Sequence, residues 1–279
     1  MRFLTSICSV LAASFLAASA HGQLPTSYWQ FNEGAGTTAN DAFGSDNGML
    51  MNGAAYGAPR TGTTGSSLNL TATGNATVQV PNNTFAGNAV SNNAITFSFW
   101  QAANVQPQSD SSFWVEGGPG NRAAQAHVPW GNGQIFFDTN GCCSQPSQRL
   151  QFTPPGGGGN PINTQGAWNH LAFVKNGNQK QVYINGALVA NQVGSSALPA
   201  FVRLWIGSAP GGGNNYNGSL DDFAVFDRGL TGAEINEIFN GSPALSVSQP
   251  SVDFGDVRYL NSGAGTTAPT AISVENSGA

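Results

Sequence analysis

Charged side chains are scarce in this sequence. Nine Lys and Arg together with 14 Asp and Glu make up 8% of its 279 residues, and the net charge is -5, whereas a soluble domain usually carries about 25% charged residues. A nucleic-acid surface needs clustered Lys and Arg to replace counterions, and a polybasic membrane patch needs the same residues, so the composition excludes both. Because hydrophobic residues still make up 40% of the chain, it can build a core and does not have the composition of a disordered protein.

Long hydrophobic runs are missing after the first twenty residues. Met1-Arg2 is followed by an apolar or small stretch from Phe3 to Ala18 and by the small residues Ala18-Ser19-Ala20. This order of a positive charge, a short apolar segment and a small-residue cleavage site predicts a secretory signal peptide over residues 1–20. No later stretch approaches the ~18 apolar residues that a membrane-spanning helix needs. We therefore expect a protein that is secreted or held at the cell surface, with no membrane span in this chain.

Cysteine is also rare. Of three cysteines, Cys8 lies in the predicted signal peptide, and Cys142 and Cys143 are adjacent. In an oxidising compartment, two neighbouring thiols can form a vicinal disulfide, and this is the pairing that we predict. Two reduced cysteines at a loop tip are the alternative. Zinc binding is disfavoured because adjacent cysteines lack the spacing that lets two sulfur atoms reach one metal ion.

Turn-forming residues, by contrast, are abundant, with 37 glycines in the chain. Between them lie short runs that alternate apolar and polar residues, as half-buried β-strands do. About a dozen such runs predict an antiparallel sandwich or barrel. One helix is expected, beginning at Thr231 with a capping box to Glu234 and ending at Asn240-Gly241. The strand-like runs are 27–31, 67–70, 76–80, 94–100, 112–115, 134–137, 149–152, 169–174, 181–184, 187–190, 202–206 and 220–226.

The spacing of strand-like runs in the sequence changes after Gly241. Residues 244–257 and 270–278 contain only three short strand-like runs, too few to bury a core of their own. Residues 244–279 either pair with the preceding domain or are the truncated beginning of a second one, and the second interpretation is favoured.

Three segments in order resemble a known family. They are Tyr28–Gly36 followed by Asp41, then Ala167–Val174 with Val182–Gly186, and finally Asn217–Thr231. Together they are similar to the LamG-like domains of the concanavalin A-like lectin/glucanase superfamily. The resemblance covers residues 24–241 and implies an all-β, two-sheet antiparallel jelly-roll sandwich with one short C-terminal helix.

Two further resemblances are local. Pro129–Asp138, leading to Cys142-Cys143 and Arg149, resembles a bacterial subset of LamG-like domains that carry a Cys-Cys pair. Val252–Asp256 and Val274–Gly278 resemble the start of an immunoglobulin-like repeat of the choice-of-anchor D or ASPM/SPD-2/Hydin type. We expect such a repeat to act as a spacer toward an anchor.

The superfamily includes glycosidases, so paired carboxylates matter. Retaining glycosidases hold two carboxyl groups about 5–5.5 Å apart and inverting ones about 6.5–9.5 Å apart. The Glu-x-Asp-x-x-Glu strand of the glucanase relatives is absent from this sequence. Asp221 and Asp222 are consecutive in a predicted strand, so we expect their side chains on opposite faces. A nucleophile elbow of the form Gly-x-Ser-x-Gly is also missing, and we expect no enzymatic activity, with a divergent glycosidase as the alternative.

A structural calcium site is implied by the resemblance alone. It would place Asp41, Asn47 in the following loop, and Asp221 or Asp222 around the ion, since calcium prefers oxygen ligands. The alternative is that Asp41 caps a turn and Asp222 pairs with Arg228. Ala42-Phe43 departs from the small polar residues that often follow the aspartate in this family.

Aromatic side chains could stack on sugar rings. The candidates are Trp114, Trp130, Phe136 and Tyr216, with Asn132, Asp138 and Asn214 as polar partners in loops and Trp130 favoured because it lies beside the Cys-Cys turn. Core packing is the alternative role for each of them. By alternation, Trp29, Trp100 and Trp168 are predicted to be core residues.

The sequence therefore favours an exported, non-catalytic recognition module that binds a polysaccharide or glycoconjugate. A structural or adhesive surface protein that contacts other proteins is the alternative, and a divergent glycosidase is the third hypothesis. A surface with so few charges is rich in Asn, Gln, Ser, Thr and Gly, which suits hydrogen bonding to neutral sugars.

Overall fold

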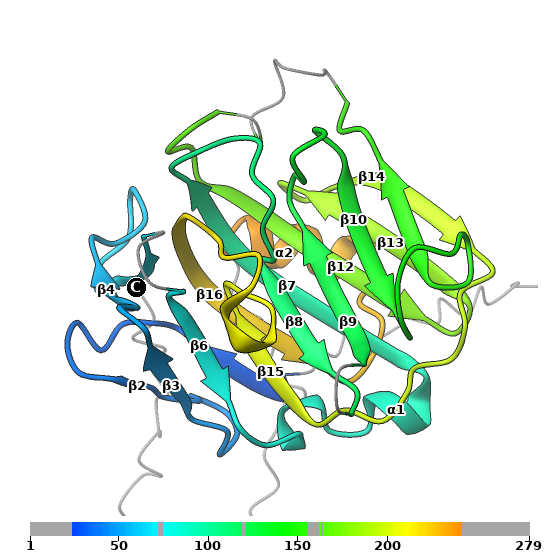
Figure 1. The fold of residues 1–279 in the computed structure, drawn as a ribbon, viewed down its shortest axis with the longest axis horizontal. Coiled ribbons are helices and arrows are strands. Elements are labelled where there is room, and N and C mark those ends of the chain that lie inside the picture. Colours follow the sequence, from blue (N-terminus) through cyan, green and yellow to red (C-terminus); the bar gives the residue numbers. More distant parts are fainter. Residues whose placement is uncertain (1–23, 72–74, 119–120, 156–161, 163, 242–279) are drawn as a thin grey trace, which may run out of the picture. The chain divides into compact units, whose positions relative to one another are not determined.

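Two antiparallel β-sheets stack face to face in this computed structural model (Figure 1). The structure describes residues 24–71, 75–118, 121–155, 162 and 164–241, all within one unit, Leu24–Ala244. The predicted signal peptide and the predicted immunoglobulin-like repeat lie outside the described residues. The prediction of a two-sheet antiparallel jelly-roll sandwich is confirmed.

Sheet A contains eight strands in the order β14-β13-β12-β7-β16-β5-β4, with β1 also paired to β16. Its strands β12, β13 and β14 are joined by two short hairpins, as the Gly/Asn turns of the sequence indicate. In the second hairpin Asn185 and Gly186 both have positive φ, 50° and 77°, which a two-residue turn matching the twist of the strands requires. The strands of sheet A are β1 (Ser27–Trp29), β4 (Ala55–Gly57), β5 (Ser67–Leu70), β7 (Ala94–Ala103), β12 (Asn169–Asn176), β13 (Gln179–Ile184), β14 (Ala187–Val193) and β16 (Gly218–Phe226).

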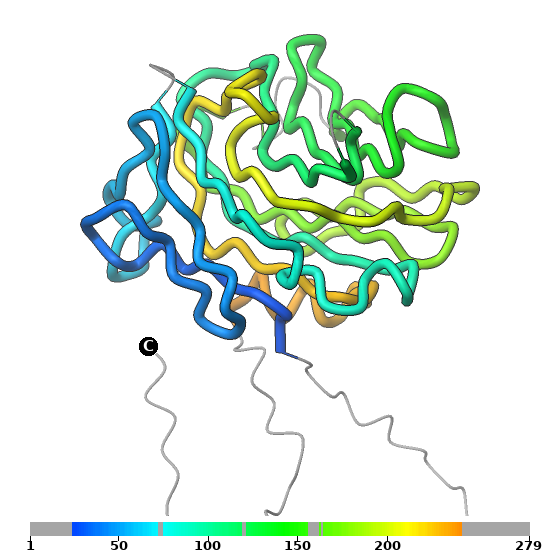
Figure 2. The backbone as a smooth tube through the Cα atoms, turned by 60° about the horizontal axis from the view of Figure 1, so that its bottom comes forward, coloured from blue at the N-terminus to red at the C-terminus, as the bar shows by residue number. Residues whose placement is uncertain are grey.

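Sheet B also contains eight strands, in the order β11-β10-β9-β8-β15-β6-β3-β2. Strand β15 lies between β6 and β8, so cyan and yellow segments far apart in the sequence run side by side (Figure 2). Such long connections between neighbouring strands are typical of a jelly roll. The strands of sheet B are β2 (Thr38–Ala39), β3 (Gly48–Met51), β6 (Thr77–Val80), β8 (Phe113–Glu116), β9 (Arg122–His127), β10 (Ile135–Thr139), β11 (Arg149–Phe152) and β15 (Arg203–Ile206).

Phenylalanines fill the space between the sheets. The ring of Phe113 on sheet B lies 4.3 Å from that of Phe97, 6.0 Å from Phe99, 5.9 Å from Phe173 and 6.0 Å from Phe223, measured between centroids. All five side chains are fully buried. Because aromatic pairs in these geometries add to the burial of apolar area, this cluster is the centre of the core.

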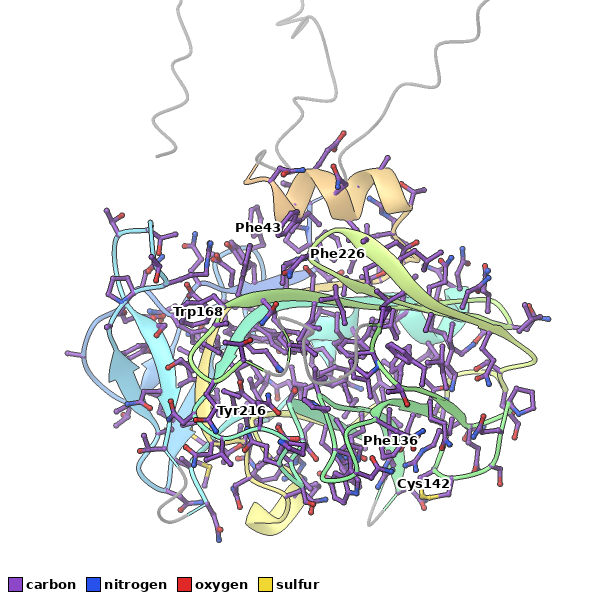
Figure 3. The ribbon with its side chains drawn as sticks, turned by 90° about the horizontal axis from the view of Figure 1, so that it is seen from above. Phe43, Phe136, Cys142, Trp168, Tyr216 and Phe226 are labelled. Atoms are coloured by element: carbon purple, nitrogen blue, oxygen red, sulfur yellow. A yellow bond between two sulfur atoms is a disulfide. The ribbon has the colours of Figure 1, made fainter. Side chains whose placement is uncertain are left out.

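Helix α2 (Gly232–Phe239) packs on the outer surface of sheet A (Figure 3). The predicted capping box is confirmed: Thr231 Oγ1 accepts from Glu234 N at 3.3 Å, and Glu234 Oε2 accepts from Thr231 N at 2.7 Å. Ile235 is fully buried against sheet A, in a cluster with Val174 and Phe226. Among the described residues, the other short helices with defined bounds are the 3₁₀ turns η1 (Thr84–Ala86) and η4 (Pro210–Gly212) and the single turn α1 (Ala89–Asn92).

The three tryptophans predicted for the core differ in burial. Trp29 is fully buried, as predicted. Trp100 is partly exposed, because the alternation that sends Phe97 and Phe99 inward sends residue 100 to the outer face of sheet A. Trp168 is also partly exposed, just before β12. The core prediction is therefore wrong for Trp100 and Trp168.

Candidate ligand-binding face

The outer face of sheet B gathers aromatic and polar side chains from neighbouring strands. Phe113 and Val115 of β8 point into the core, so Trp114 between them points outward. Strand pairing places Trp114 opposite Trp205 of β15 and opposite Gln125 of β9. Further outward positions on this face are Glu116, Arg122, His127, Phe136, Asp138, Arg149, Gln151 and Arg203.

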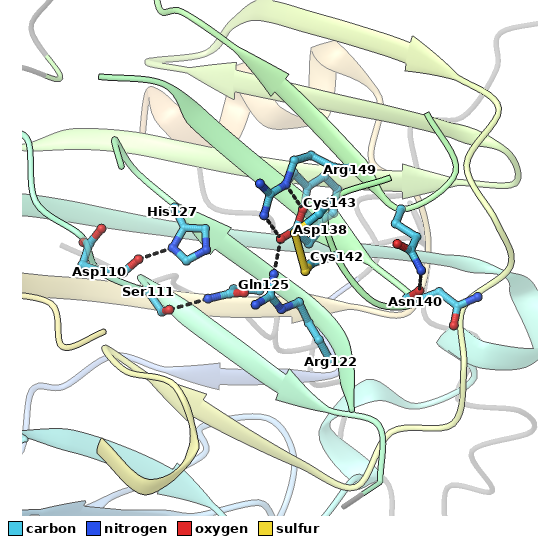
Figure 4. Close-up of polar contacts among 12 residues, drawn as sticks. Asp110, Ser111, Arg122, Gln125, His127, Asp138, Asn140, Cys142, Cys143 and Arg149 are labelled. Atoms are coloured by element: carbon cyan, nitrogen blue, oxygen red, sulfur yellow. Dashed lines mark hydrogen bonds and ion pairs between the residues drawn. A yellow bond between two sulfur atoms is a disulfide. The ribbon is translucent and has the colours of Figure 1, made fainter. Parts of the chain in front are cut away.

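Asp138 is the polar centre of this face, between two arginines (Figure 4). Its side chain is fully buried. Arg149 donates from Nε to Oδ1 at 2.6 Å and from Nη2 to Oδ2 at 2.7 Å, and Arg122 donates from Nη1 to Oδ2. One carboxylate is thus shared by two guanidinium groups. Asp138 was predicted as a loop residue, but it lies within β10, where it fixes both arginines.

The guanidinium group of each of these two arginines packs over an aromatic ring. The guanidinium carbon of Arg122 lies 4.4 Å from the centroid of the Trp114 ring, and that of Arg149 lies 4.2 Å from the centroid of Phe136. Cation–π contacts of this kind orient a planar guanidinium and limit its rotamers. Phe136 is 5% exposed, so Arg149 covers most of its ring, whereas Trp114 is partly exposed.

Trp130 lies in the turn that joins β9 to β10. Its N–H donates to Gln134 O at 2.8 Å and its carbonyl accepts from Gly133 N at 2.7 Å, which closes the turn. The exposed Asn132 accepts from Gln134 N at 3.0 Å and so caps the same turn. The Trp130 ring packs edge-on against His127, 4.4 Å between centroids, and remains partly exposed. The structure therefore places Trp130 at the rim of the face that carries Trp114 and Phe136.

Cys142 and Cys143 lie in the loop between β10 and β11, close to Asp138 (Figure 4). Their sulfur atoms lie against one another and their Cα atoms are 3.7 Å apart. Cys143 has a φ of 79°, a conformation that few residues other than glycine adopt. The geometry suits a vicinal disulfide, whose formation stays a prediction.

Below the rim, His127 and Asp110 are buried together. His127 is the last residue of β9, where its Nδ1 hydrogen bonds with the carbonyl of Asp110. Burial is the main cause that lowers the pKa of His127 to about 4, which keeps the imidazole neutral. Burial also raises the pKa of the fully buried Asp110 well above its ordinary value. Tyr216 is fully buried as well, so its ring offers no face to a ligand, and Asn214 lies in the neighbouring loop.

A second acidic group lies on the outer face of sheet A. Arg60 Nη2 is 3.2 Å from Asp222 Oδ2, and Arg60 Nε is 3.7 Å from Asp221 Oδ2. The prediction of opposite faces is wrong, because a bulge in β16 and a left-handed Asp222 (φ 51°) bring both carboxylates to one side. Burial, then repulsion from Asp222, raises the pKa of Asp221 to about 8. The predicted alternative pairing of Asp222 with Arg228 is also wrong, since Arg228 pairs with Glu234.

The residues predicted for calcium are already engaged. Asp41 Oδ1 accepts from the backbone N–H groups of Tyr28 and Gly44, both at 2.9 Å, and Asn47 Oδ1 accepts from Asp41 N at 2.9 Å. Burial raises the pKa of Asp41, but the hydrogen bonds from Gly44 and Tyr28 more than offset it and lower the pKa below its ordinary value. These donors satisfy the carboxylate as a turn cap.

Asp222 Oδ1 accepts a hydrogen bond from the hydroxyl group of Tyr28 at 2.5 Å. Asp222 also forms an ion pair with Arg60. Within the described residues, no group of three or more His, Cys, Asp or Glu side chains could hold a metal ion. The set does not fit a calcium ion as it stands, and calcium binding stays a prediction.

Sequence reasoning missed much of the candidate face. It named Trp114, Trp130, Phe136 and Asp138, which the structure brings together, but not Arg122, Arg203 or Trp205. The sequence does not show which strands pair with one another. It also does not mark β9 as a strand, because its residues Arg-Ala-Ala-Gln-Ala-His include few β-branched or aromatic side chains. In that part of the chain covered by the structure, no helix is long and apolar enough to cross a membrane.

The fold is that of a lectin-like β-sandwich. The family model described as the concanavalin A-like lectin/glucanases superfamily matches residues 72–236, more than half of the chain, and the chain belongs to this family. Comparison of the sequence with curated proteins found no match.

Solved structures with the same fold include sugar complexes. Domain 4 of AbnA, an extracellular arabinanase of Geobacillus stearothermophilus in complex with arabinotriose, is 17% identical with a TM-score of 0.58, over 77% of this chain and 98% of that one. The binding domain of botulinum neurotoxin DC in complex with SialylT is 15% identical with a TM-score of 0.58, over 80% of this chain and 52% of that one. Trypanosoma rangeli sialidase with the inhibitor DANA is 14% identical with a TM-score of 0.53, over 76% and 32%. The chain spans about half of the toxin domain and a third of the sialidase, and identities this low show the fold alone.

Proposed function

We propose that residues 24–241 form an exported, non-catalytic carbohydrate-binding module whose ligand lies on the outer face of sheet B. The observation that carries the proposal is the partly exposed Trp114, which lies next to Trp205 across β8 and β15 on that face. Trp205 is only 9% exposed and supports the ring of Trp114 from the neighbouring strand. The flat apolar faces of indole rings suit the C–H faces of sugar rings, and their polar edges suit hydroxyl groups.

Polar groups around the pair can bind hydroxyl groups. Trp114 Nε1 has no hydrogen-bond partner, and neither has Gln125 Oε1, although both atoms are buried. Buried polar atoms usually find a partner, and a ligand hydroxyl or a bridging water supplies one here. Trp130 extends the face at its rim.

The similar domain of the arabinanase supports the same class of function. That domain was solved with arabinotriose, and the present chain spans 98% of it, so a unit of this size and fold can hold an oligosaccharide. The proposed secreted or surface location rests on the predicted signal peptide. The proposed absence of catalysis rests on the acidic residues, which are held in ion pairs with arginines. Asp138 is fixed between two arginines, and Asp221 and Asp222 share Arg60.

A glycan array with the purified domain tests the proposal. We expect binding to at least one polysaccharide, and a Trp114→Ala variant should weaken it at least about tenfold, as truncation of an aromatic at the centre of an interface does. Trp168→Ala is the matched control, since Trp168 is a partly exposed tryptophan outside this face, and it should bind as the wild type does.

Two results would overturn the proposal. Absence of binding to every glycan, with or without added calcium, would favour the adhesive or structural alternative. Hydrolysis of any bound glycan by the pure protein would instead identify a divergent glycosidase, and the Asp221–Asp222 pair would then be the first acids to substitute.

A further inference from the structure

Basic side chains gather on the outer face of sheet B. Of the nine Lys and Arg in the sequence, Arg2 and Arg258 lie outside the described residues, which leaves seven. Three of these seven, Arg122, Arg149 and Arg203, point outward from β9, β11 and β15 on this one face. Among the described residues, the acids that form ion pairs with them are Asp138 and Glu116. This face therefore carries one positive charge in excess on a chain whose net charge is -5.

The ion pairs leave guanidinium donors unused. An arginine side chain has five N–H donors. Asp138 accepts from Nε and Nη2 of Arg149 and from Nη1 of Arg122. Arg122 Nε is buried with no hydrogen-bond partner, and so is Arg203 Nε, although it lies 3.0 Å from Glu116 Oε2. Among the described residues, these two Nε atoms therefore have no acceptor in hydrogen-bond geometry.

The arginines are also held in place before any ligand binds. Arg122 lies on the ring of Trp114 and Arg149 on that of Phe136, and Asp138 ties the two together. A guanidinium that is already oriented loses little freedom when it donates two hydrogen bonds to an oxyanion. Arg203 has a side chain that is 39% exposed and lies beside the Trp114–Trp205 pair.

We infer that the sugar bound on this face is acidic, with a carboxylate or a sulfate ester that accepts hydrogen bonds from Arg122, Arg149 and Arg203. This inference rests on the proposed function and narrows its ligand class. The composition of the whole chain suits neutral sugars, but the charge at the site does not. The pyranose ring contacts the exposed part of Trp114, and its anionic group points to the guanidinium groups, as charge-assisted hydrogen bonds require.

Matched polymers test the inference by isothermal titration calorimetry. Polygalacturonate is compared with its fully methyl-esterified form, and dextran sulfate with dextran, so that each pair differs in charge and not in backbone. Hyaluronan and a sialylated glycan extend the acidic set. We expect at least one acidic polymer to bind about tenfold or more tightly than its neutral counterpart, the range of a charge-assisted hydrogen bond. The pair that responds tells carboxylate from sulfate.

Three variants connect such binding to the arginines. Arg203→Gln removes the most exposed of them and should weaken binding of the acidic polymer about tenfold or more. Arg228→Gln is the control, because Arg228 pairs with Glu234 at the start of α2, and it should bind unchanged. Asp138→Asn removes a competing negative charge while keeping the shape of the side chain, and a folded variant should bind the acidic polymer more tightly.

The outcomes separate this inference from the function that it rests on. Equal binding of the esterified and free polymers, lost in Trp114→Ala, would overturn the acidic ligand and keep the carbohydrate-binding module. Acidic binding that survives both Arg203→Gln and Trp114→Ala would show general attraction to a polyanion and would overturn the inference. Binding of no polymer in the set would overturn both. If Asp138→Asn fails to fold, the Arg203→Gln and Arg228→Gln pair still decides.

Discussion

The outer faces of the two sheets each carry a group of arginine, aspartate and aromatic side chains, but the ratio of arginine to aspartate is opposite on the two faces. On sheet A, one arginine, Arg60, serves two carboxylates, Asp221 and Asp222, and lies 4.0 Å over Trp100. On sheet B, two arginines serve one carboxylate, Asp138, and lie over Trp114 and Phe136. Because the pKa of Asp221 is raised to about 8, its carboxyl keeps its proton at neutral pH. The sheet A group is then neutral overall, whereas the sheet B group has one positive charge in excess, before Arg203 and Glu116 are counted.

The faces also differ in what covers them. Helix α2 packs on sheet A, where Phe239 stacks on Trp100 at 5.7 Å between centroids. Helix α2 lies on the side of sheet A that faces away from sheet B (Figure 3), so it does not cover the outer face of sheet B. The comparison teaches that an aromatic–arginine–carboxylate group is not by itself a binding site. The recognition role proposed for the sheet B group rests on its charge balance. Its side chains are no more exposed than those of the sheet A group, since Arg122 and Arg149 are 16% and 13% exposed against 19% for Arg60.

The largest expected effect comes from removing the single acid of sheet B. Asp138→Ala leaves Arg122 and Arg149 without a partner, with side chains only 16% and 13% exposed. Loss of one partner from a largely buried ion pair costs about 3 kcal/mol, and we expect that decrease in the free energy of unfolding in urea titrations. Asp222→Ala on sheet A should cost less, because Arg60 keeps Asp221 as a partner. Equal losses would contradict the difference in charge balance between the faces.

The second prediction concerns the pH dependence of sheet A. Asp221 has a pKa of about 8 in the folded protein, against about 3.9 in an unfolded chain. Between these values the unfolded state has lost a proton that the folded state keeps, so stability falls as pH rises from about 4 to 8. Asp221→Asn cannot ionise and retains an oxygen for the hydrogen bond from Asp222 N.

The variant should therefore gain stability over the wild type as pH rises, by about 2 kcal/mol at pH 8 after allowance for solvent and for coupling to Asp222. Urea unfolding of both proteins at pH 5 and pH 8 measures this. A difference that stays constant with pH would show that Asp221 ionises normally. Asp138→Asn gives the sheet B counterpart, and it should destabilise at both pH values because its two arginines remain charged.

Each face has one buried histidine, and these provide the third prediction. Burial lowers the pKa of His127 under sheet B to about 4 and that of His170 on sheet A to about 3, with Arg60 adding to the second shift. An unfolded histidine takes up its proton near pH 6.5. Below that value the unfolded state binds more protons, so stability is lost as pH falls from about 6.5 toward 4.

His127→Gln should remove its share of this acid sensitivity, about 1–2 kcal/mol between pH 7 and pH 5. The share of His170 should be similar in sign, tested with His170→Gln, which keeps a polar group near Ser98 Oγ. Thermal unfolding across that pH range measures both. An unchanged slope in both variants would show that neither histidine is kept neutral by the fold.

The sequence predicted the class of fold and about half of the candidate face. Strong alternation in Phe97–Phe99 and the capping box at Thr231 gave correct elements, because local pattern determined both. Asp222 was misjudged because a β-bulge reverses the alternation, and a bulge depends on the partner strand. Arg122 was missed for a related reason: its role comes from Asp138 and Trp114, which long-range strand pairing brings to it.

The smallest effect should come from Cys142 and Cys143, which have no counterpart on sheet A. If they form the predicted vicinal disulfide, non-reducing mass spectrometry will find the tryptic segment lighter by two hydrogens. A bond between adjacent residues closes the shortest loop and so restricts the unfolded chain little, and Cys142→Ser with Cys143→Ser should lower the free energy of unfolding by less than about 1 kcal/mol. The loop that they form lies beside Asp138 and Arg149, so the same variant should weaken ligand binding more clearly than it weakens the fold. A large loss of stability would show instead that this turn supports the sheet and not the face.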